Sequence, residues 1–197
     1  MIDKDIDTGG IIYRQECKIG REDSVGDVHD KLMDIGSELV CQTVEGIIQR
    51  AVETRVQRSF VQGSEVLKPA PKLTRELCHI DWNDSTENIY NLIRGLSPYP
   101  TAFTEIYPAG TEDKPLSMKI FKAETMKLSG TPGQILSDGK TYLAVATADG
   151  AIGIKDLQLA GKKRMETKAF LLGFREPEKY VCTQGTSKAE ILKTKKV

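Results

Sequence analysis

Three consecutive cations, Lys162, Lys163 and Arg164, are the residues of this chain whose type and spacing most clearly favour a binding function. They follow a predicted strand and precede a predicted helical segment, which places them in a surface loop. Lys119 and Lys122 lie on another predicted strand. Clustered cations steer and hold phosphates, so this set predicts contact with the backbone of a nucleic acid.

The net charge of the whole chain is zero, but the two parts of the sequence differ strongly. Residues 1–113 hold 12 Lys and Arg against 20 Asp and Glu, a net charge of −8. Residues 114–197 hold 16 against 8, a net charge of +8. This asymmetry indicates a polyanionic partner for the second part, and a solvated face followed by a basic tail is the alternative.

The acidic residues at the start of the chain suggest a calcium loop, but the pattern fails in detail. Asp3, Asp5 and Asp7 have the spacing of the first ligands. A helix-loop-helix calcium site needs Gly directly after the third ligand and Glu at the twelfth position, where this chain has Thr8 and Arg14. No calcium site is predicted.

Cysteine and histidine are too scattered for a metal site. The sequence contains no Cys-x-x-Cys pair, and its two histidines are far apart. Neither zinc nor a disulfide framework is indicated, and reduced thiols in a reducing compartment are expected. The residues concerned are Cys17, Cys41, Cys78, Cys182, His29 and His79.

Length and composition favour a globular protein of the cytoplasm. The 197 residues are 39% hydrophobic, and no run approaches the roughly 18 apolar residues that span a bilayer. The first residues are acidic, whereas a signal peptide begins with basic and then apolar residues. We therefore predict no membrane contact.

The first elements that the pattern of apolar residues predicts are a strand and a long helix. Apolar and polar residues alternate over 11–19, which predicts a half-exposed edge strand. Ser24 opens a helix that continues to about Ala51. Its apolar stripe consists of Val25, Val28, Leu32, Ile35, Leu39, Val44, Ile47 and Ile48.

A second helix leads into the rest of the chain. Asp84, with Glu87 three residues on, forms a capping box, and apolar residues follow at helical spacing. Gly95 ends this helix. Pro98 and Pro100 prevent its continuation.

Short strands at regular spacing follow, separated by turn residues such as Asp-Gly and Pro-Gly. This spacing predicts a small antiparallel barrel of the oligonucleotide-binding type, in which closure removes the sheet edges. From Phe174 the periodicity is lost, as in a tail. The predicted strands are 101–107, 116–123, 134–136, 141–147 and 151–158.

The order of short strings resembles a known family. Ile-Asp-Trp, about seven residues, and then Asn-Leu-Ile-Arg-Gly-Leu-Ser-Pro-Tyr-Pro-Thr-Ala is similar to the entry into the C-terminal domain of methionyl-tRNA formyltransferase. Pro-Gly-Gln-Ile-Leu and Leu-Gln-Leu-Ala-Gly-Lys-Lys-Arg-Met follow in the same order as in that family. Asp-Thr-Gly-Gly near the start resembles the last third of its catalytic domain.

The resemblance implies an α+β chain with four parts. A strand-helix remnant of the formyltransferase α/β (Rossmann-like) domain covers residues 1–62, and a linker covers 63–79. The OB-like β-barrel covers 80–175, and a tail covers 176–197.

The resemblance also implies the reaction. This family transfers a formyl group from 10-formyltetrahydrofolate to the amino group of methionyl-tRNA in translation initiation, a step of one-carbon metabolism. The acidic residue before Thr-Gly belongs to the family's active site, which assigns Asp7 a catalytic role. The family's Asn-x-His motif, which supplies the general base and the oxyanion donor, is absent from this chain. The chain is therefore expected to lack the N-terminal half of the catalytic domain, to be inactive alone and to bind the folate poorly.

The implied partner is initiator methionyl-tRNA, with Lys72 and Arg75 of the linker added to its phosphate contacts. Two alternatives are a formyltransferase that acts on a nucleotide-linked amino sugar and a non-catalytic tRNA-binding protein. A homodimer is expected through the truncated N-terminal region, because the apolar stripe of the long helix needs a cover.

Overall fold

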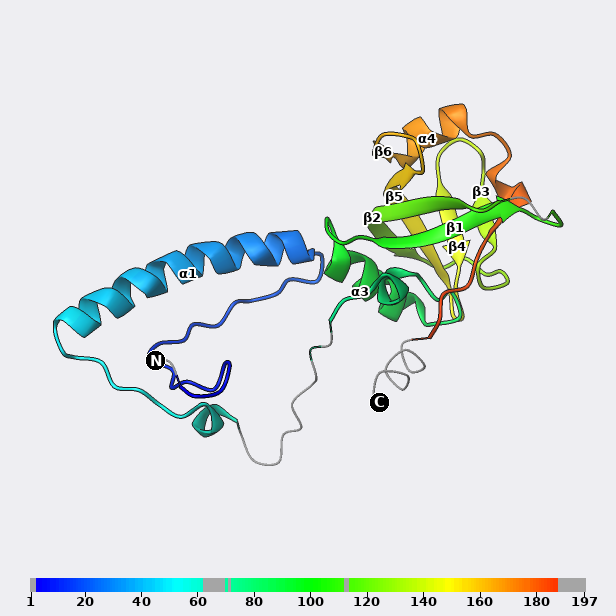
Figure 1. The fold of residues 1–197 in the computed structure, drawn as a ribbon. Helices are drawn as coiled ribbons and strands as arrows, with labels where there is room; N and C mark the ends of the chain where they lie inside the picture. The colour runs from blue at the N-terminus through cyan, green and yellow to red at the C-terminus, as the bar shows by residue number, and fades with distance from the viewer. Residues whose placement is uncertain (1–2, 62–69, 71, 112–113, 188–197) are drawn as a thin grey trace. The chain divides into compact units, whose positions relative to one another are not determined.

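The structure is a computed structural model, which describes residues 3–61, 70, 72–111 and 114–187. It divides into two compact units, shown in Figure 1. Unit 1 comprises Met1–Asp23 and Asp27–Lys72, and unit 2 comprises Ser24–Gly26 and Leu73–Val197. The predicted combination of helical and strand structure with a small antiparallel barrel is confirmed.

The long helix predicted in the first part of the chain is confirmed as α1, Val25–Ile48. Much of its apolar stripe remains in contact with solvent: Leu32 is 49% exposed and Val44 is 52% exposed. A 3-10 helix, η1, follows at Gln57–Phe60. None of the helices built by the described residues is both long enough and apolar enough to span a membrane.

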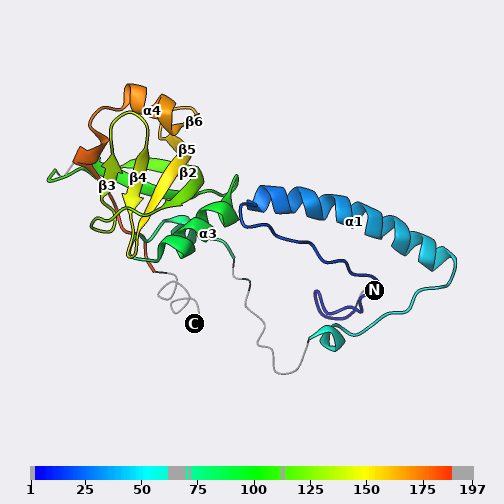
Figure 2. The same ribbon diagram turned by 180° about the vertical axis from the view of Figure 1, so that it is seen from behind.

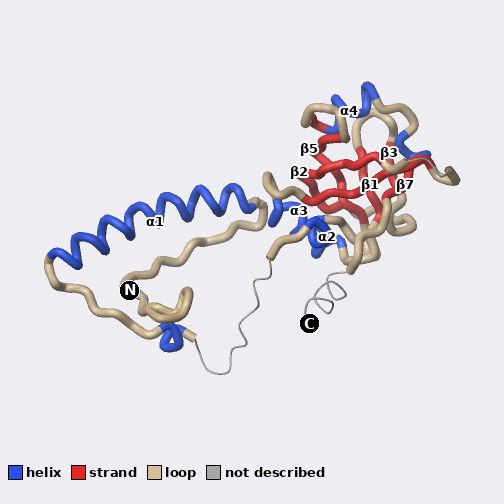
Figure 3. Tube along the Cα trace, in the orientation of Figure 1, coloured by secondary structure: helices blue, strands red, loops and turns tan. Residues whose placement is uncertain are grey.

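The strand predicted over residues 11–19 is wrong. Only Ile11 pairs, through two backbone hydrogen bonds of 2.9 Å with Arg55, and the residues after it are loop (Figure 3). A strand is stable only when neighbouring backbone satisfies its donors and acceptors, and the described part of unit 1 offers this segment a single pairing. The alternating pattern is present, but the described residues do not supply the row of backbone hydrogen bonds that a strand over 11–19 would need.

Unit 2 is an antiparallel sheet in the order β3-β4-β5-β2-β1-β7, with β6 paired to β5. A bridge between Gln134 and Val181 links the two ends of this order and nearly closes the barrel. The strands are β1 Ala102–Pro108, β2 Leu116–Met126, β3 Ile135–Ser137, β4 Leu143–Ala146, β5 Ala151–Leu159, β6 Met165–Glu166 and β7 Tyr180–Cys182.

Two helices lie at opposite ends of the barrel, as both views show (Figures 1 and 2). They are α3, Thr86–Leu96, and α4, Thr167–Gly173. Trp82 is completely buried, and its indole Nε1 donates a hydrogen bond of 3.0 Å to Oγ1 of Thr104. Burial also raises the pKa of the Cys182 thiol to about 12, so this thiol stays protonated.

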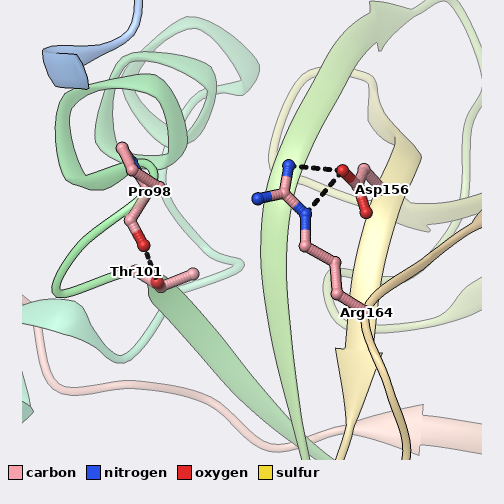
Figure 4. Close-up of polar contacts among 4 residues, drawn as sticks. All are labelled: Pro98, Thr101, Asp156 and Arg164. Carbon is pink, nitrogen blue, oxygen red and sulfur yellow. Dashed lines mark hydrogen bonds and ion pairs between the residues drawn. The ribbon is translucent and has the colours of Figure 1, made fainter.

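The N-cap of α3 is Ser85, one residue later than the predicted Asp84. The Ser85 hydroxyl accepts a hydrogen bond from the backbone N–H of Asn88. The Asp84 carboxylate instead accepts from the side chain of Asn88, at 2.7 Å. After the helix, Thr101 takes a left-handed φ of 79°, and its hydroxyl donates to the carbonyl of Pro98, at 2.6 Å (Figure 4).

The sheet continues beyond residue 175, where the barrel domain was predicted to end. The 3-10 helix η2, Pro177–Lys179, leads into β7, which pairs with β1. The predicted tail is therefore part of the barrel as far as this strand, and residues 188–197 lie outside the described residues. The predicted linker lies partly outside them as well, and its last part forms α2, Arg75–Cys78, in unit 2.

Candidate nucleic-acid interface

The alternation of β2 sets which of its side chains face outward. Met118 and Ile120 are fully buried in the core, whereas Lys119 is exposed and Phe121 is half-buried. A β-bulge after Ile120 changes the register, and Lys122 is exposed as well. The strand therefore presents two lysines and one phenyl ring on the outer surface of the barrel.

The pairing of β2 with β5 brings the loop cations to the same surface. Gln158 lies opposite Lys119, and its amide Nε2 donates a 3.0 Å hydrogen bond to the carbonyl of Lys162. The backbone N–H of Lys162 in turn donates to Leu159, at 2.9 Å. The loop with Lys162 and Lys163 is thus fixed directly after the end of β5.

Arg164 is held in one position by two neighbours. Its guanidinium lies 4.2 Å from the centre of the Phe121 ring. Its Nε and Nη2 both donate to Oδ2 of Asp156, at 2.8 and 2.5 Å. Figure 4 shows the remaining nitrogen, Nη1, pointing away from the carboxylate. A cation over an aromatic face combined with a charge-assisted hydrogen bond restrains an arginine strongly.

A second arginine, Arg75 of α2, is held in a similar way by two residues of β1. Arg75 lies 5.4 Å from the centre of the Phe103 ring and 3.9 Å from a carboxylate oxygen of Glu105. Phe103 pairs directly with Lys119 of β2, so this arginine belongs to the same surface. The imidazole of His79 stacks on the Phe103 ring, and burial lowers the pKa of His79. The neutral form of His79 is therefore favoured near pH 7.

A shallow groove of about 630 Å³ runs along this surface between β5, the loop before β4 and the start of α4. Four cations line it: Lys122, Lys155, Arg164 and Lys168. Lys155 is paired with Glu124, at 2.6 Å. Within the described residues, Lys122 and Lys168 make no ion pair, so their charges remain available to a ligand.

The structure gathers six of the predicted binding residues on one surface of unit 2. We call this surface the cationic face and define it as Arg75, Lys119, Lys122, Lys162, Lys163 and Arg164. Lys72, the seventh, is exposed at the end of unit 1.

The two arginines of the cationic face are held by residues that were not among the predicted binding residues: Phe103, Phe121 and Asp156. The alternation of β2 contained a signal for Phe121, because residues 119 and 121 fall on one side of a strand. No comparable local signal joined Asp156 to Arg164.

Asp7 occupies an exposed turn of unit 1. It has a left-handed φ of 60°, and its carbonyl accepts a 2.7 Å hydrogen bond from Gln57. In the same unit, His29 contacts Asp30, at 3.1 Å. An exposed carboxylate without the Asn-x-His motif does not form an enclosed folate site, so the described residues around Asp7 do not fit that cofactor by themselves. In the described part of the chain, no cluster of three or more His, Cys, Asp or Glu side chains is placed to hold a metal ion.

Comparison with known proteins defines the class. Residues 72–175 match the family described as the C-terminal domain of formyl transferases. The barrel and its cationic face therefore belong to a formyl transferase C-terminal domain.

Two relatives identified by sequence are methionyl-tRNA formyltransferases. The chain is 42% identical over 178 residues to the methionyl-tRNA formyltransferase of Parabacteroides distasonis, covering 89% of this chain and 54% of that protein. It is 44% identical over 175 residues to that of Phocaeicola vulgatus, covering 87% and 53%. The chain belongs to the methionyl-tRNA formyltransferase family and matches the C-terminal part of these relatives. It spans about half the length of the curated relatives that it matches.

Solved structures support the fold alone. HypX from Aquifex aeolicus in complex with tetrahydrofolic acid is 19% identical, with a TM-score of 0.60 over 87% of this chain and 28% of that one. The sugar 3N-formyl transferase WlaRD, solved with dTDP and 5-N-formyl-THF, is 19% identical, with a TM-score of 0.51 over 82% and 53%.

Proposed function

We propose that this chain supplies the tRNA-binding part of a methionyl-tRNA formyltransferase and that initiator methionyl-tRNA is its ligand. The observation that carries the proposal is the cationic face, where cations from α2, β2 and the loop after β5 lie together. Such a face suits the phosphate backbone of a folded RNA, which is recognised by its charge and shape. The names of the relatives favour tRNA over an amino-sugar nucleotide as the substrate.

The finer functional assignments belong to this proposal. Formyl transfer would use 10-formyltetrahydrofolate in the cytoplasm during translation initiation, as the family implies. Folate would be held mainly by elements outside this chain, because Asp7 lies in an exposed turn. We also propose that the apolar stripe of α1 is covered by a second copy of the chain, and the Discussion gives the test.

Charge reversal in the loop tests the proposed face. Lys162→Glu combined with Lys163→Glu is expected to weaken binding to an initiator tRNA transcript by about tenfold or more, and to reduce the salt dependence by about 2 in the slope of log K against log salt. Two phosphate contacts would be lost, and each such contact releases counterions from the RNA when it forms. Filter binding or fluorescence anisotropy between about 50 and 200 mM salt measures both quantities.

Lys195→Glu with Lys196→Glu is the matched control, since it makes the same change in charge outside the described residues. It is expected to weaken binding less. Equal losses in the two double variants would show that the excess positive charge acts without a defined face, and would contradict the proposal.

The chain alone is expected to transfer no formyl group from 10-formyltetrahydrofolate to methionyl-tRNA. The physical reason is that the Asn-x-His base and oxyanion donor are absent from the sequence. Acid gel electrophoresis of the tRNA product measures this directly, with a full-length relative as the positive control. Turnover that disappears in Asp7→Asn would contradict the expectation and reveal another base.

A further inference from the structure

The two arginines of the cationic face differ from its lysines, because each lies on a phenyl ring and reaches a carboxylate. Arg164 has the closer contacts of the two, at 4.2 Å from the ring centre of Phe121 and 2.5 Å from Asp156. The three residues come from β2, β5 and the loop before β6, which adjacent pairing in one sheet brings together. Such restraint lowers the rotamer entropy that an arginine loses when it binds a ligand.

The geometry leaves the guanidinium, and not the carboxylate, turned toward solvent. The side chain of Asp156 is 20% exposed, whereas that of Arg164 is 48% exposed. Asp156 engages Nε and Nη2 through a single oxygen, Oδ2, and Nη1 points away (Figure 4). Lys122 lies opposite Asp156 in the strand register, and Lys168 lines the same groove. Lys122 and Lys168 therefore share one groove with Arg164, and the carboxylates of Glu124 and Glu166 line it as well.

We propose that Asp156 and Phe121 are positioning residues that hold Arg164 so that its Nη1 edge binds one phosphate of a folded RNA. The inference rests on the proposed tRNA-binding function and goes further by assigning a phosphate subsite and the residues that build it. The ligand group is a phosphodiester, because the guanidinium edge offers paired N–H donors to its oxygens.

This arrangement reverses the simple electrostatic expectation for Asp156. A carboxylate beside a phosphate site repels the ligand, so its removal should tighten binding if charge alone mattered. If Asp156 positions Arg164, its removal frees the guanidinium and weakens binding instead. The two explanations predict opposite signs for one substitution.

The experiment measures the affinity of the full chain for an initiator tRNA transcript at fixed salt. Asp156→Asn is expected to weaken binding by about three- to tenfold, as for partial loss of one charge-assisted contact. The matched control is Glu124→Gln, which removes the carboxylate of another exposed pair on the same two strands, 2.6 Å from Lys155. The control is expected to bind equally well or up to about twofold tighter, because one repulsive charge is lost.

A double-variant cycle separates positioning from a general structural role. In an Arg164→Gln chain, adding Asp156→Asn is expected to cause no further loss, since Asp156 acts only through Arg164. Asp156→Glu should restore part of the affinity, and Phe121→Leu should weaken binding as Asp156→Asn does. Thermal unfolding midpoints identify any variant whose loss reflects misfolding.

Three results would overturn the inference. Binding by Asp156→Asn that is as tight as that of the original chain, or tighter, would assign Asp156 a purely repulsive effect. An equal loss of affinity on Asp156→Asn in the original chain and in the Arg164→Gln chain would assign Asp156 a general structural role. An original chain that binds no tRNA would refute the proposed function itself, and the phosphate subsite with it.

Discussion

Trp82→Ala is expected to destabilise the barrel by about 3–5 kcal/mol, a large part of the roughly 5–15 kcal/mol that holds a typical domain folded. Trp82 is fully buried in the core, and its indole donates to Thr104. Alanine would leave a large cavity and remove that hydrogen bond. Urea denaturation followed by circular dichroism measures the loss, because the chain contains only this one Trp and fluorescence would disappear with it.

Two controls separate the cavity from other effects. Trp82→Phe keeps an aromatic ring but loses the indole N–H, and should cost clearly less than Trp82→Ala. Tyr99→Ala truncates an aromatic side chain that is 84% exposed, and should change stability by no more than about 0.5 kcal/mol. Equal stability of Trp82→Ala and Trp82→Phe would contradict the assignment of Trp82 to the core.

The exposed apolar side chains of α1 are expected to make the chain dimerise at micromolar concentration, and they include Val44 and Ile48 of the predicted stripe and also Val40, which that stripe did not contain. Val40 is 63% exposed and Ile48 is 76% exposed, and burying one such side chain fully is worth roughly 1.5–3 kcal/mol. Several of these residues repeat along one helix, so their mutual burial favours association. Sedimentation equilibrium should give a mass near twice the chain mass of 21.8 kDa.

Val40→Glu combined with Val44→Glu is expected to restore the monomer, because two carboxylates would have to be buried in the contact. Gln42→Glu places a carboxylate at an exposed polar position of the same helix and should leave the dimer intact. A monomeric original chain at about 100 μM, a concentration at which even weak dimers form, would refute self-association through this helix.

Local sequence patterns were sufficient to predict most of the helices and strands of unit 2. The helix before the barrel was predictable because capping, apolar spacing and prolines act within a few residues, and the cap differed by only one position. The strands were predictable because turn residues separate them. The failure at residues 11–19 has the opposite cause: a strand depends on a partner elsewhere, and only Ile11 has one.

The sequence by itself determined the family, the barrel and the clustering of cations in the second part of the chain, because composition, order and spacing are properties of the chain. Only the tertiary structure decided how those cations are held. Arg164, Asp156 and Phe121 come from three segments, and their contact depends on the pairing of β5 with β2 and β6 and on a bulge in β2. One residue of register shift would turn every side chain of a strand to the other face, and no local pattern fixes that register.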